Sequence, residues 1–189
     1  PAEPLMAPNA AVYGLTARVL HWLTAALVLT MIPAGIAMVN IGSGPLQDFL
    51  FNLHRSFGVL LVPVILLRLA NRLIDPPPPL PADIPLVQQF AATSVHWALY
   101  ALLIVQPIVG WIGTSAFRAP IIVFGLFELP PIWPPDRAFS DQVFVLHRAI
   151  GFLIALLITV HIAGALFHHF VRRDDVLLRM WNARLRRAG

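Results

Sequence analysis

The sequence predicts an all-α integral membrane protein, a four-helix bundle with both termini on the cytoplasmic side. The first reason is composition: of the 189 residues, 58% are apolar and 12% are charged, whereas a soluble domain carries about 25% charged residues. The second is the length of the apolar stretches, since about 20 apolar residues cross a bilayer. The third is the placement of the arginines, most of which fall on one side of the predicted spans.

Four helices are expected over about residues 15–39, 48–70, 92–116 and 142–171, followed by a tail over 172–189, in a single domain 1–189. Three of them contain uncharged runs long enough to span, over 19–39, 95–117 and 149–171. The second predicted helix contains Arg55 and Arg68, and it spans because their long side chains reach outward. Pro33, Pro63 and Pro107 lie inside the first three helices and predict kinks that neighbouring helices tolerate.

The three connections differ in character. Residues 40–47 form a short glycine-proline turn, and residues 75–85, with four consecutive prolines, form a stiff extended link. The connection over 118–141 is too rich in proline for a regular helix, yet it is apolar. We expect this connection to lie against the membrane surface and to cover a site.

The arginines predict the orientation. Arginine is the only basic residue type besides histidine, and its 13 copies against 9 acids give a formal net charge of +4. Eight of them follow the second or fourth span, at positions 68, 72, 172, 173, 179, 184, 186 and 187. The positive-inside rule places that side in the cytoplasm, and anionic lipid then explains the basic tail better than nucleic acid does. No nucleic-acid partner is expected, and no cleavable signal peptide precedes Leu15 because those residues are proline-rich and polar.

Seven histidines carry the candidate chemistry, because cysteine is absent. Without cysteine there are no disulfides, thiolate zinc sites, iron–sulfur clusters or thioether-linked hemes. Ionisable side chains at membrane depth are costly and usually face a site. His147 and His161 are fourteen residues apart, which separates them by about 21 Å along one helix and points both to nearly the same face.

The positions of the histidines along the spans predict two b-type heme sites, one near each membrane surface. His54 and His147 lie near the outer ends of their spans, and His21, His96 and His161 lie toward the cytoplasmic side. A b-type heme takes two imidazoles from facing helices, without a covalent link. On the outer side His54 is expected to pair with His147, and on the inner side His21 with His161, with His96 as a competitor. Two stacked hemes carry electrons across the bilayer.

Other residues near the expected ligands have two interpretations each. Arg55 and Arg148 follow the outer ligands directly and suit the heme propionates as bidentate donors. Gly58 and Gly151 follow the same ligands by four residues and either let a porphyrin approach the backbone or serve ordinary helix packing. The remaining histidines, His96, His168 and His169, are structural groups or part of a quinone site.

Several segments resemble the prokaryotic cytochrome b561 family. They are Arg-Val-Leu-His-Trp-Leu at 18–23, Leu-His-Arg-Ser-Phe-Gly at 53–58, His-Trp at 96–97, the proline-to-glycine stretch 107–110, Leu-His-Arg-Ala-Ile-Gly at 146–151, and the closing stretch over 161–180. The resemblance covers most of the chain, and the closing stretch is its most specific part. The family is similar in turn to the membrane cytochrome b subunits of respiratory hydrogenases and formate dehydrogenases.

The resemblance implies a four-helix protein of the bacterial inner membrane with two hemes b. It supports the pairs His54 with His147 and His21 with His161, and it leaves His96 outside the ligand set. It also implies oxidation of periplasmic superoxide and reduction of ubiquinone. Superoxide is a small anion that outer arginines would steer; the candidates are Arg55, Arg118, Arg137 and Arg148, and their field is opposed by Glu128, Asp136 and Asp141.

Two other functions remain open at this stage. The chain is an electron-transfer subunit if a docked dehydrogenase or soluble cytochrome supplies its electrons, with the aromatic connection 118–141 as the docking face. It is a heme-free bundle if its histidines only pack. The quinone site lies either at the inner histidines His96, His168 and His169 or under the outer connection.

Overall fold

The computed structural model describes residues 12–80 and 83–181, and it contains four long helices that are apolar enough to cross a membrane. They are α1 (Leu15–Asn40), α2 (Pro45–Ile74), α3 (Leu86–Phe117) and α4 (Arg137–Phe167). Two short strands, β1 (Ile121–Val123) and β2 (Phe127–Leu129), connect α3 to α4. The π-helical turn η1 (His168–Arg172) continues α4, and the short helix α5 (Leu178–Trp181) follows. The prediction of a four-helix membrane bundle is confirmed. The predictions for the tail beyond residue 181 and for the first eleven residues lie outside the described residues.

All four predicted helices are present, but three begin earlier than predicted. α2 begins at Pro45 because proline suits the first helical turn, where its missing N–H costs nothing. α4 begins at Arg137 rather than at 142, because the Asp136 side chain accepts a hydrogen bond from the Phe139 N–H at 3.0 Å and caps the helix. α3 begins at Leu86, directly after Pro85. The predicted kink prolines lie inside α1, α2 and α3.

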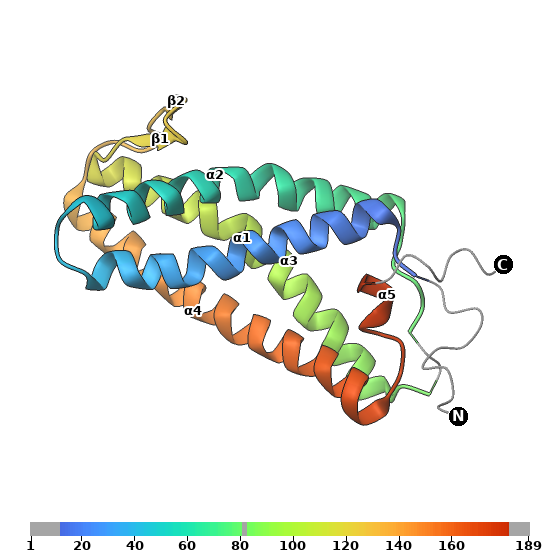
Figure 1. Ribbon diagram of the computed structural model, residues 1–189. Helices are drawn as coiled ribbons and strands as arrows, with labels where there is room; N and C mark the ends of the chain where they lie inside the picture. Colours follow the sequence, from blue (N-terminus) through green and yellow to red (C-terminus); the bar gives the residue numbers. More distant parts are fainter. Residues whose placement is uncertain (1–11, 81–82, 182–189) are drawn as a thin grey trace.

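The connection between α3 and α4, which was expected not to form a regular helix, contains an antiparallel hairpin. β1 pairs with β2 so that Ile122 lies opposite Glu128. The turn is possible because Phe124 and Gly125 both take positive φ, 50° and 73°, as tight hairpin turns require. β1 packs on α2, and Ser56 of α2 accepts a hydrogen bond from the Phe124 N–H at 2.9 Å. The hairpin therefore follows α3 in the chain and packs against the first half of α2 (Figure 1).

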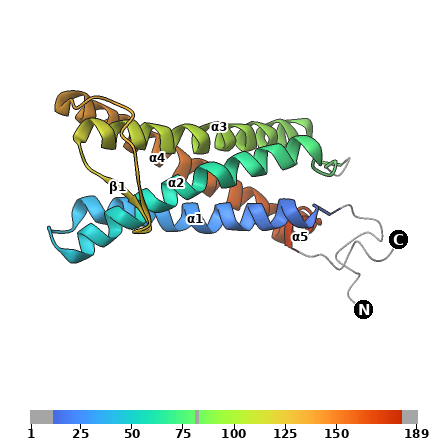
Figure 2. The same cartoon turned by 90° about the horizontal axis from the view of Figure 1, so that it is seen from above.

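The helices form two closely packed pairs, α1 with α2 and α3 with α4, and α2 contacts α3. The pair α3 and α4 diverges from α1 toward the end where α5 lies (Figure 1), and α2 crosses between α1 and α3 in the view from above (Figure 2). We call the two ends of the bundle the hairpin end and the α5 end.

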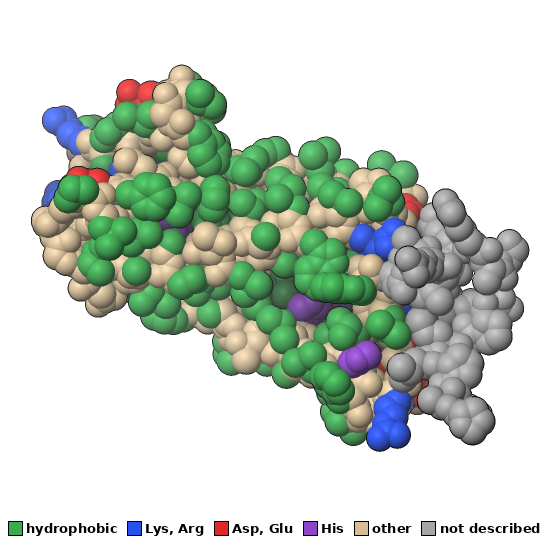
Figure 3. All heavy atoms as spheres, in the orientation of Figure 1, with side chains coloured by type: hydrophobic (Ala, Val, Ile, Leu, Met, Phe, Trp, Pro, Cys, Tyr) green, Lys and Arg blue, Asp and Glu red, His purple; other side chains and the backbone are tan. Residues whose placement is uncertain are grey.

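The buried core lies between these ends. It is built from apolar side chains of all four helices, among them Leu27, Leu61, Tyr100 and Ile154, and Ile65 at its centre is 0% exposed. The outer surface of the spans is also apolar, as the green side chains in Figure 3 show. An apolar exterior around hydrogen-bonded helices is what a lipid environment requires.

Candidate heme sites

At the hairpin end, the structure brings His54 of α2 and His147 of α4 together. Their ring centroids are 6.1 Å apart and the ring planes are inclined by 75°. A single metal ion bound by both rings through bonds of about 2 Å would hold the centroids about 6 Å apart. The spacing therefore fits two imidazoles on opposite sides of one iron.

Each of these two rings rests against a glycine of the neighbouring helix. A Cβ atom added at Gly35 of α1 would lie 3.0 Å from Cε1 of His54, and one added at Gly110 of α3 would lie 3.0 Å from Cε1 of His147. In both cases Nδ1 lies nearer to the glycine than Nε2 does. The two helix pairs thus present their histidines in the same way, with Nε2 farther from the supporting helix.

Hydrogen bonds orient the same two residues. Nδ1 of His54 donates to the carbonyl of Met31 at 3.1 Å, which leaves its Nε2 free to bind a metal. A histidine that binds a metal usually donates a hydrogen bond from its other ring N–H in this way, which fixes the tautomer. Gln106 donates from Nε2 to the His147 carbonyl at 2.8 Å. Within the described residues, Nδ1 of His147 has no hydrogen-bond partner.

At the α5 end, three histidines from three helices meet. His161 of α4 is the common neighbour: its ring centroid is 6.1 Å from that of His21 on α1 and 5.1 Å from that of His96 on α3. The distance to His21 equals that of the hairpin-end pair, whereas the distance to His96 is too short for two rings on opposite sides of one iron.

An arginine distinguishes this cluster. Arg68 of α2 donates to Nδ1 of His21 at 2.8 Å. A guanidinium has only donors, so Nδ1 of His21 accepts and the ring proton of a neutral His21 lies on Nε2. With this contact in place His21 presents an N–H rather than a lone pair. The ring spacing favours His21 as the second ligand beside His161, whereas the contact with Arg68 favours His96. Both histidines are therefore candidates for that second ligand.

A cavity of about 970 Å³ opens at the α5 end. His21, His96, His161 and His168 line it, together with Arg68 and many apolar side chains. Figure 3 shows the hollow near this end of the bundle, with a histidine side chain visible in it. The volume lies in the range of binding sites for cofactors and other small molecules.

The two arginines predicted to bind the propionates differ in their surroundings. The half-buried Arg55 donates from Nη1 to the carbonyl of Pro120 at 3.3 Å and stacks over Phe51, so its side chain holds the hairpin. Arg148 is exposed on α4. Whether either residue also binds a propionate stays a prediction.

Gly58 and Gly151 lie at helix–helix contacts, which agrees with one of their two interpretations, ordinary helix packing. A Cβ at Gly58 would meet only the flexible end of Met31 at 3.6 Å, and one at Gly151 would meet Gln106 at 3.3 Å. Two other glycines, Gly35 and Gly110, contact the histidine rings, and no role of this kind was expected for them. Both follow a helix proline within three residues, at Pro33 and Pro107, and this spacing is the signal that was available.

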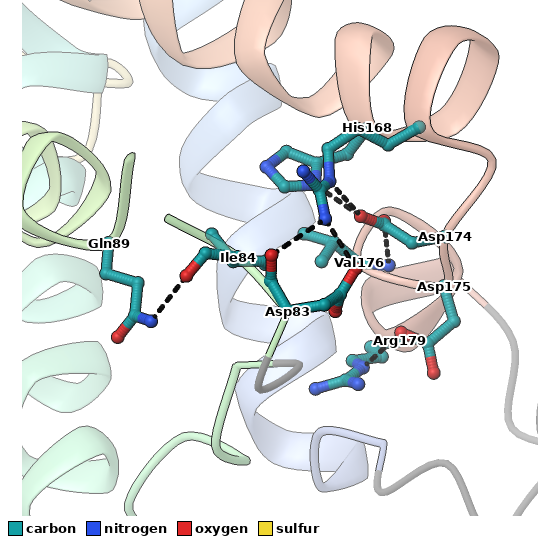
Figure 4. A network of polar contacts seen from close by, with 9 residues as sticks. Asp83, Ile84, Gln89, His168, Asp174, Asp175, Val176 and Arg179 are labelled. Atoms are coloured by element: carbon teal, nitrogen blue, oxygen red, sulfur yellow. Dashed lines mark hydrogen bonds and ion pairs between the residues drawn. The ribbon is translucent and has the colours of Figure 1, made fainter. Parts of the chain in front are cut away.

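The last two histidines, His168 and His169, differ in their hydrogen bonding. His168 begins η1, and its Nδ1 lies 2.5 Å from a carboxylate oxygen of Asp174. Arg172 links the same carboxylate to Asp83, with contacts of 3.2 Å and 2.6 Å. Figure 4 shows His168, Asp174 and Asp83 at this end of the bundle. Within the described chain, Nδ1 of His169 is buried without a partner.

Comparison with known proteins identifies relatives along almost the whole chain. The family profile described as "Prokaryotic cytochrome b561" matches residues 12–183. "Cytochrome b561 homolog 2" of Escherichia coli (strain K12) is 36% identical over 173 residues, which cover 89% of this chain and 90% of that protein. "Probable superoxide oxidase CybB" of Yersinia pestis is 28% identical over 162 residues, with 85% and 90% covered. "Cytochrome b561 homolog 1" of Escherichia coli (strain K12) is 28% identical over 177 residues, with 89% and 96% covered.

Proposed function

Since this chain belongs to the prokaryotic cytochrome b561 family, which binds heme b and transfers electrons in the bacterial inner membrane, we propose that it holds two hemes b and passes electrons across the bilayer to a quinone. The observation that carries the proposal is the equal spacing of two histidine pairs at the two ends of the bundle, 6.1 Å in each case. His54 and His147 bind the heme at the hairpin end, and His21 and His161 bind the other. In the heme-bound state His21 carries its ring proton on Nδ1, and the Arg68 guanidinium has moved off that atom.

The hairpin end faces the periplasm in this proposal. Among the described residues, six arginines lie at or near the α5 end, and they are Arg18, Arg68, Arg72, Arg172, Arg173 and Arg179. Four lie at the hairpin end, where Asp48, Glu128, Asp136 and Asp141 offset them. By the positive-inside rule the α5 end is cytoplasmic, and the start of α1 and the end of α5 then lie on that side.

The chain supplies the surroundings in which electron transfer takes place. A bound heme b supplies an iron that gains and loses one electron at a time. The histidines hold it, and the carbonyl of Met31 orients His54. The core around Ile65 lies between the two sites and excludes water. Arg68 places a positive charge at the cytoplasmic site, which favours an electron arriving there.

Superoxide is the proposed electron donor and ubiquinone the proposed acceptor. The support is the relative from Yersinia pestis whose name describes a probable superoxide oxidase. Two superoxide anions each lose one electron and leave as dioxygen, and one quinone takes both electrons with two protons to become a quinol. The cavity at the α5 end has the size and the apolar lining that a quinone ring needs.

A docked protein donor is the second candidate, and two observations favour it. At the hairpin end Arg137 is already paired with Asp141 at 3.3 Å, so it adds little to the attraction of an anion. The hairpin also exposes a large apolar tip, where Leu126 is 79% and Phe127 53% exposed. Exposed apolar patches of this kind are typical of protein or membrane contacts.

The first test is a heme count on the detergent-purified protein. Reduced-minus-oxidised spectra with pyridine-hemochrome quantification should give two hemes b per chain, and a colourless protein would refute the proposal. The second test mixes the loaded protein with enzymatically generated superoxide, with superoxide dismutase as the control. Reduction of the hemes that dismutase abolishes supports superoxide as the donor. Reduction only by a co-purifying protein supports the docked donor.

A further inference from the structure

Two arginines of α2 lie one helical turn apart at the cavity of the α5 end. Arg68 and Arg72 both line this cavity, and both side chains are half-buried. Residues four positions apart lie on the same face of a helix, so the two guanidinium groups serve one region of the cavity. Because α2 runs from the hairpin end toward the α5 end, Arg72 lies nearer to the α5 end than Arg68 does.

Aromatic rings of α3 support both guanidinium groups. Cζ of Arg68 lies 5.2 Å from the ring centroid of Tyr100. Cζ of Arg72 lies 5.7 Å from the same centroid and 5.4 Å from the centroid of Trp97. A guanidinium that lies over an aromatic face keeps its N–H donors available for an acceptor. The contacts with α3 therefore hold the two arginines in place without using up their donors.

The charge of these arginines is not balanced within the residues that the structure describes. Neither arginine forms an ion pair there. Arg68 donates to Nδ1 of His21, and a ring that accepts a hydrogen bond at this nitrogen is neutral. Among the described residues that line the cavity, Asp75 is the one acid, and it is exposed. Because a cation in a membrane span is costly without an anion beside it, the cavity suits a ligand that carries negative charge.

A heme b carries such charge on its two propionates. Both propionates are carboxylates on one edge of the porphyrin, and arginine binds a carboxylate through two parallel hydrogen bonds. His21 and His161, the proposed iron ligands of this site, line the same cavity as the two arginines. The cavity therefore offers one guanidinium for each propionate.

We propose that Arg68 and Arg72 bind the two propionates of the α5-end heme, and that this binding releases His21 for the iron. The inference rests on the proposed function. A carboxylate accepts two hydrogen bonds from a guanidinium, whereas Nδ1 of His21 accepts one, so a propionate draws Arg68 away from the ring. One N–H bond of His21 then breaks at Nε2 and one forms at Nδ1, with water as the carrier. The ring stays neutral, and the lone pair of Nε2 is available to the iron.

An anionic lipid headgroup is the other source of negative charge at this end, because basic residues near the cytoplasmic surface attract such lipids. Arg173 provides the control for this alternative. It lies at the same end of the bundle, directly after η1, and it is exposed and outside the lining of the cavity. Its replacement removes the same charge without changing a group at the proposed heme site.

The test compares heme b with its dimethyl ester, in which both propionates are uncharged. A His147→Ala background leaves the α5-end site to be titrated, and circular dichroism checks that each heme-depleted protein keeps its helices. Since a hydrogen bond to a charged group contributes about tenfold or more in affinity, we expect heme b to bind about 100-fold more tightly than the ester. Arg68→Leu and Arg72→Leu should each reduce this preference to about tenfold, and Arg173→Leu should not change it. In the purified holoprotein, Arg72→Leu should also transfer this heme to apomyoglobin about tenfold faster.

A spectroscopic readout tests the release of His21. With the ester, Arg68 stays on Nδ1 of His21, so the iron has His161 as its one strong ligand and should be high-spin by electron paramagnetic resonance. With heme b the iron should be low-spin. Arg68→Leu should make the ester low-spin as well, because leucine has no donor that occupies Nδ1. Low-spin iron with the ester in the protein that retains Arg68 would overturn the inference.

The affinities decide in the same way. Equal binding of heme b and its ester would overturn the inference and assign both arginines to lipid headgroups, as would an equal loss of preference in Arg173→Leu. If Arg68→Leu or Arg72→Leu does not fold, the two porphyrins still give this answer without an arginine substitution. A protein that holds two hemes b but shows no preference leaves the proposed function intact. A protein that binds no heme refutes the proposed function itself.

Discussion

The two ends of the bundle present histidines in different ways. At the hairpin end two rings face each other, and each rests on a glycine of the neighbouring helix. At the α5 end three rings surround a cavity, and Arg68 competes for one of them. The hairpin-end arrangement leaves no space for a larger residue at either glycine, because an added Cβ would lie 3.0 Å from a histidine ring. The second leaves space for another molecule.

This difference teaches how one small bundle can combine two tasks. A site that only holds a cofactor gains from rigid, close packing, which fixes the ligands before binding. A site that also takes a substrate needs an open volume and polar groups that can respond. The divergence of α3 and α4 from α1 at the α5 end accompanies that volume (Figure 1). The following predictions test the comparison, beginning with the largest expected effect.

Removal of either heme ligand on α4 should have the largest effect. His147→Ala and His161→Ala should each retain about half of the wild-type heme, because each leaves one iron without its second imidazole. His21→Ala should lose the α5-end heme and His96→Ala should keep it. Pyridine-hemochrome quantification measures this, with His169→Ala as the control. Loss of heme in His96→Ala but not in His21→Ala would make His96 the partner of His161.

Glycine substitutions should weaken only the hairpin end. Gly35→Ala and Gly110→Ala force the adjacent ring or helix to move, and overpacking of this kind costs about 1–3 kcal/mol. We therefore expect the affinity of that site for heme to fall by about 10- to 100-fold, since about 1.4 kcal/mol corresponds to tenfold. Heme titration of the apoprotein measures this. Gly58→Ala is the control because its nearest contact is the flexible end of Met31, and an equal loss there would contradict the proposed cradle.

Removal of the positive charge of Arg68 should shift one redox potential. Arg68→Gln should lower the midpoint potential of the α5-end heme by tens of millivolts, where about 59 mV is a tenfold change for one electron. The reason is that a positive charge beside His21 favours the reduced state. Potentiometric titration of both hemes provides its own control, since the hairpin-end potential should change little. Equal shifts at both ends would show that Arg68 does not belong to one site.

The smallest expected effect is an acid dependence of the segment 173–181, which follows η1 and contacts α1 through Trp22. Burial raises the pKa of Asp174, but hydrogen bonds from His168, the Val176 N–H and Arg172 outweigh it and hold that pKa below its usual value. The contribution of Asp174 to the attachment of this segment is therefore complete above the unfolded pKa of about 3.9 and is lost as pH falls through the folded pKa. We expect the environment of Trp181, which packs on Trp22 with ring centroids 5.0 Å apart, to change only below about pH 4. Difference fluorescence between wild type and Trp181→Phe measures this, and Asp174→Asn should remove the dependence. A transition at pH 6 would exclude Asp174 as its origin.

Part of the candidate site could be predicted because helix geometry is regular. The fourteen-residue spacing of His147 and His161 places one histidine at each end of α4 whatever the neighbouring helices do. Antiparallel connection of successive spans then brings His54 near His147 and His21 near His161, as the structure shows. The hairpin was not expected, because its strands are three residues long and a proline-rich connection hides so short a pattern.

Composition and spacing were sufficient for the membrane class, the four helices and the depth of each histidine, because hydrophobicity and helical rise are properties of a single segment. The supporting roles of Gly35 and Gly110, the contact of Arg68 with His21, and the pairing of His168 with Asp174 depend on how separate segments pack. Only the folded bundle decides these, since the angle between two helices and the side chains that meet there follow from the complementary shapes of both surfaces.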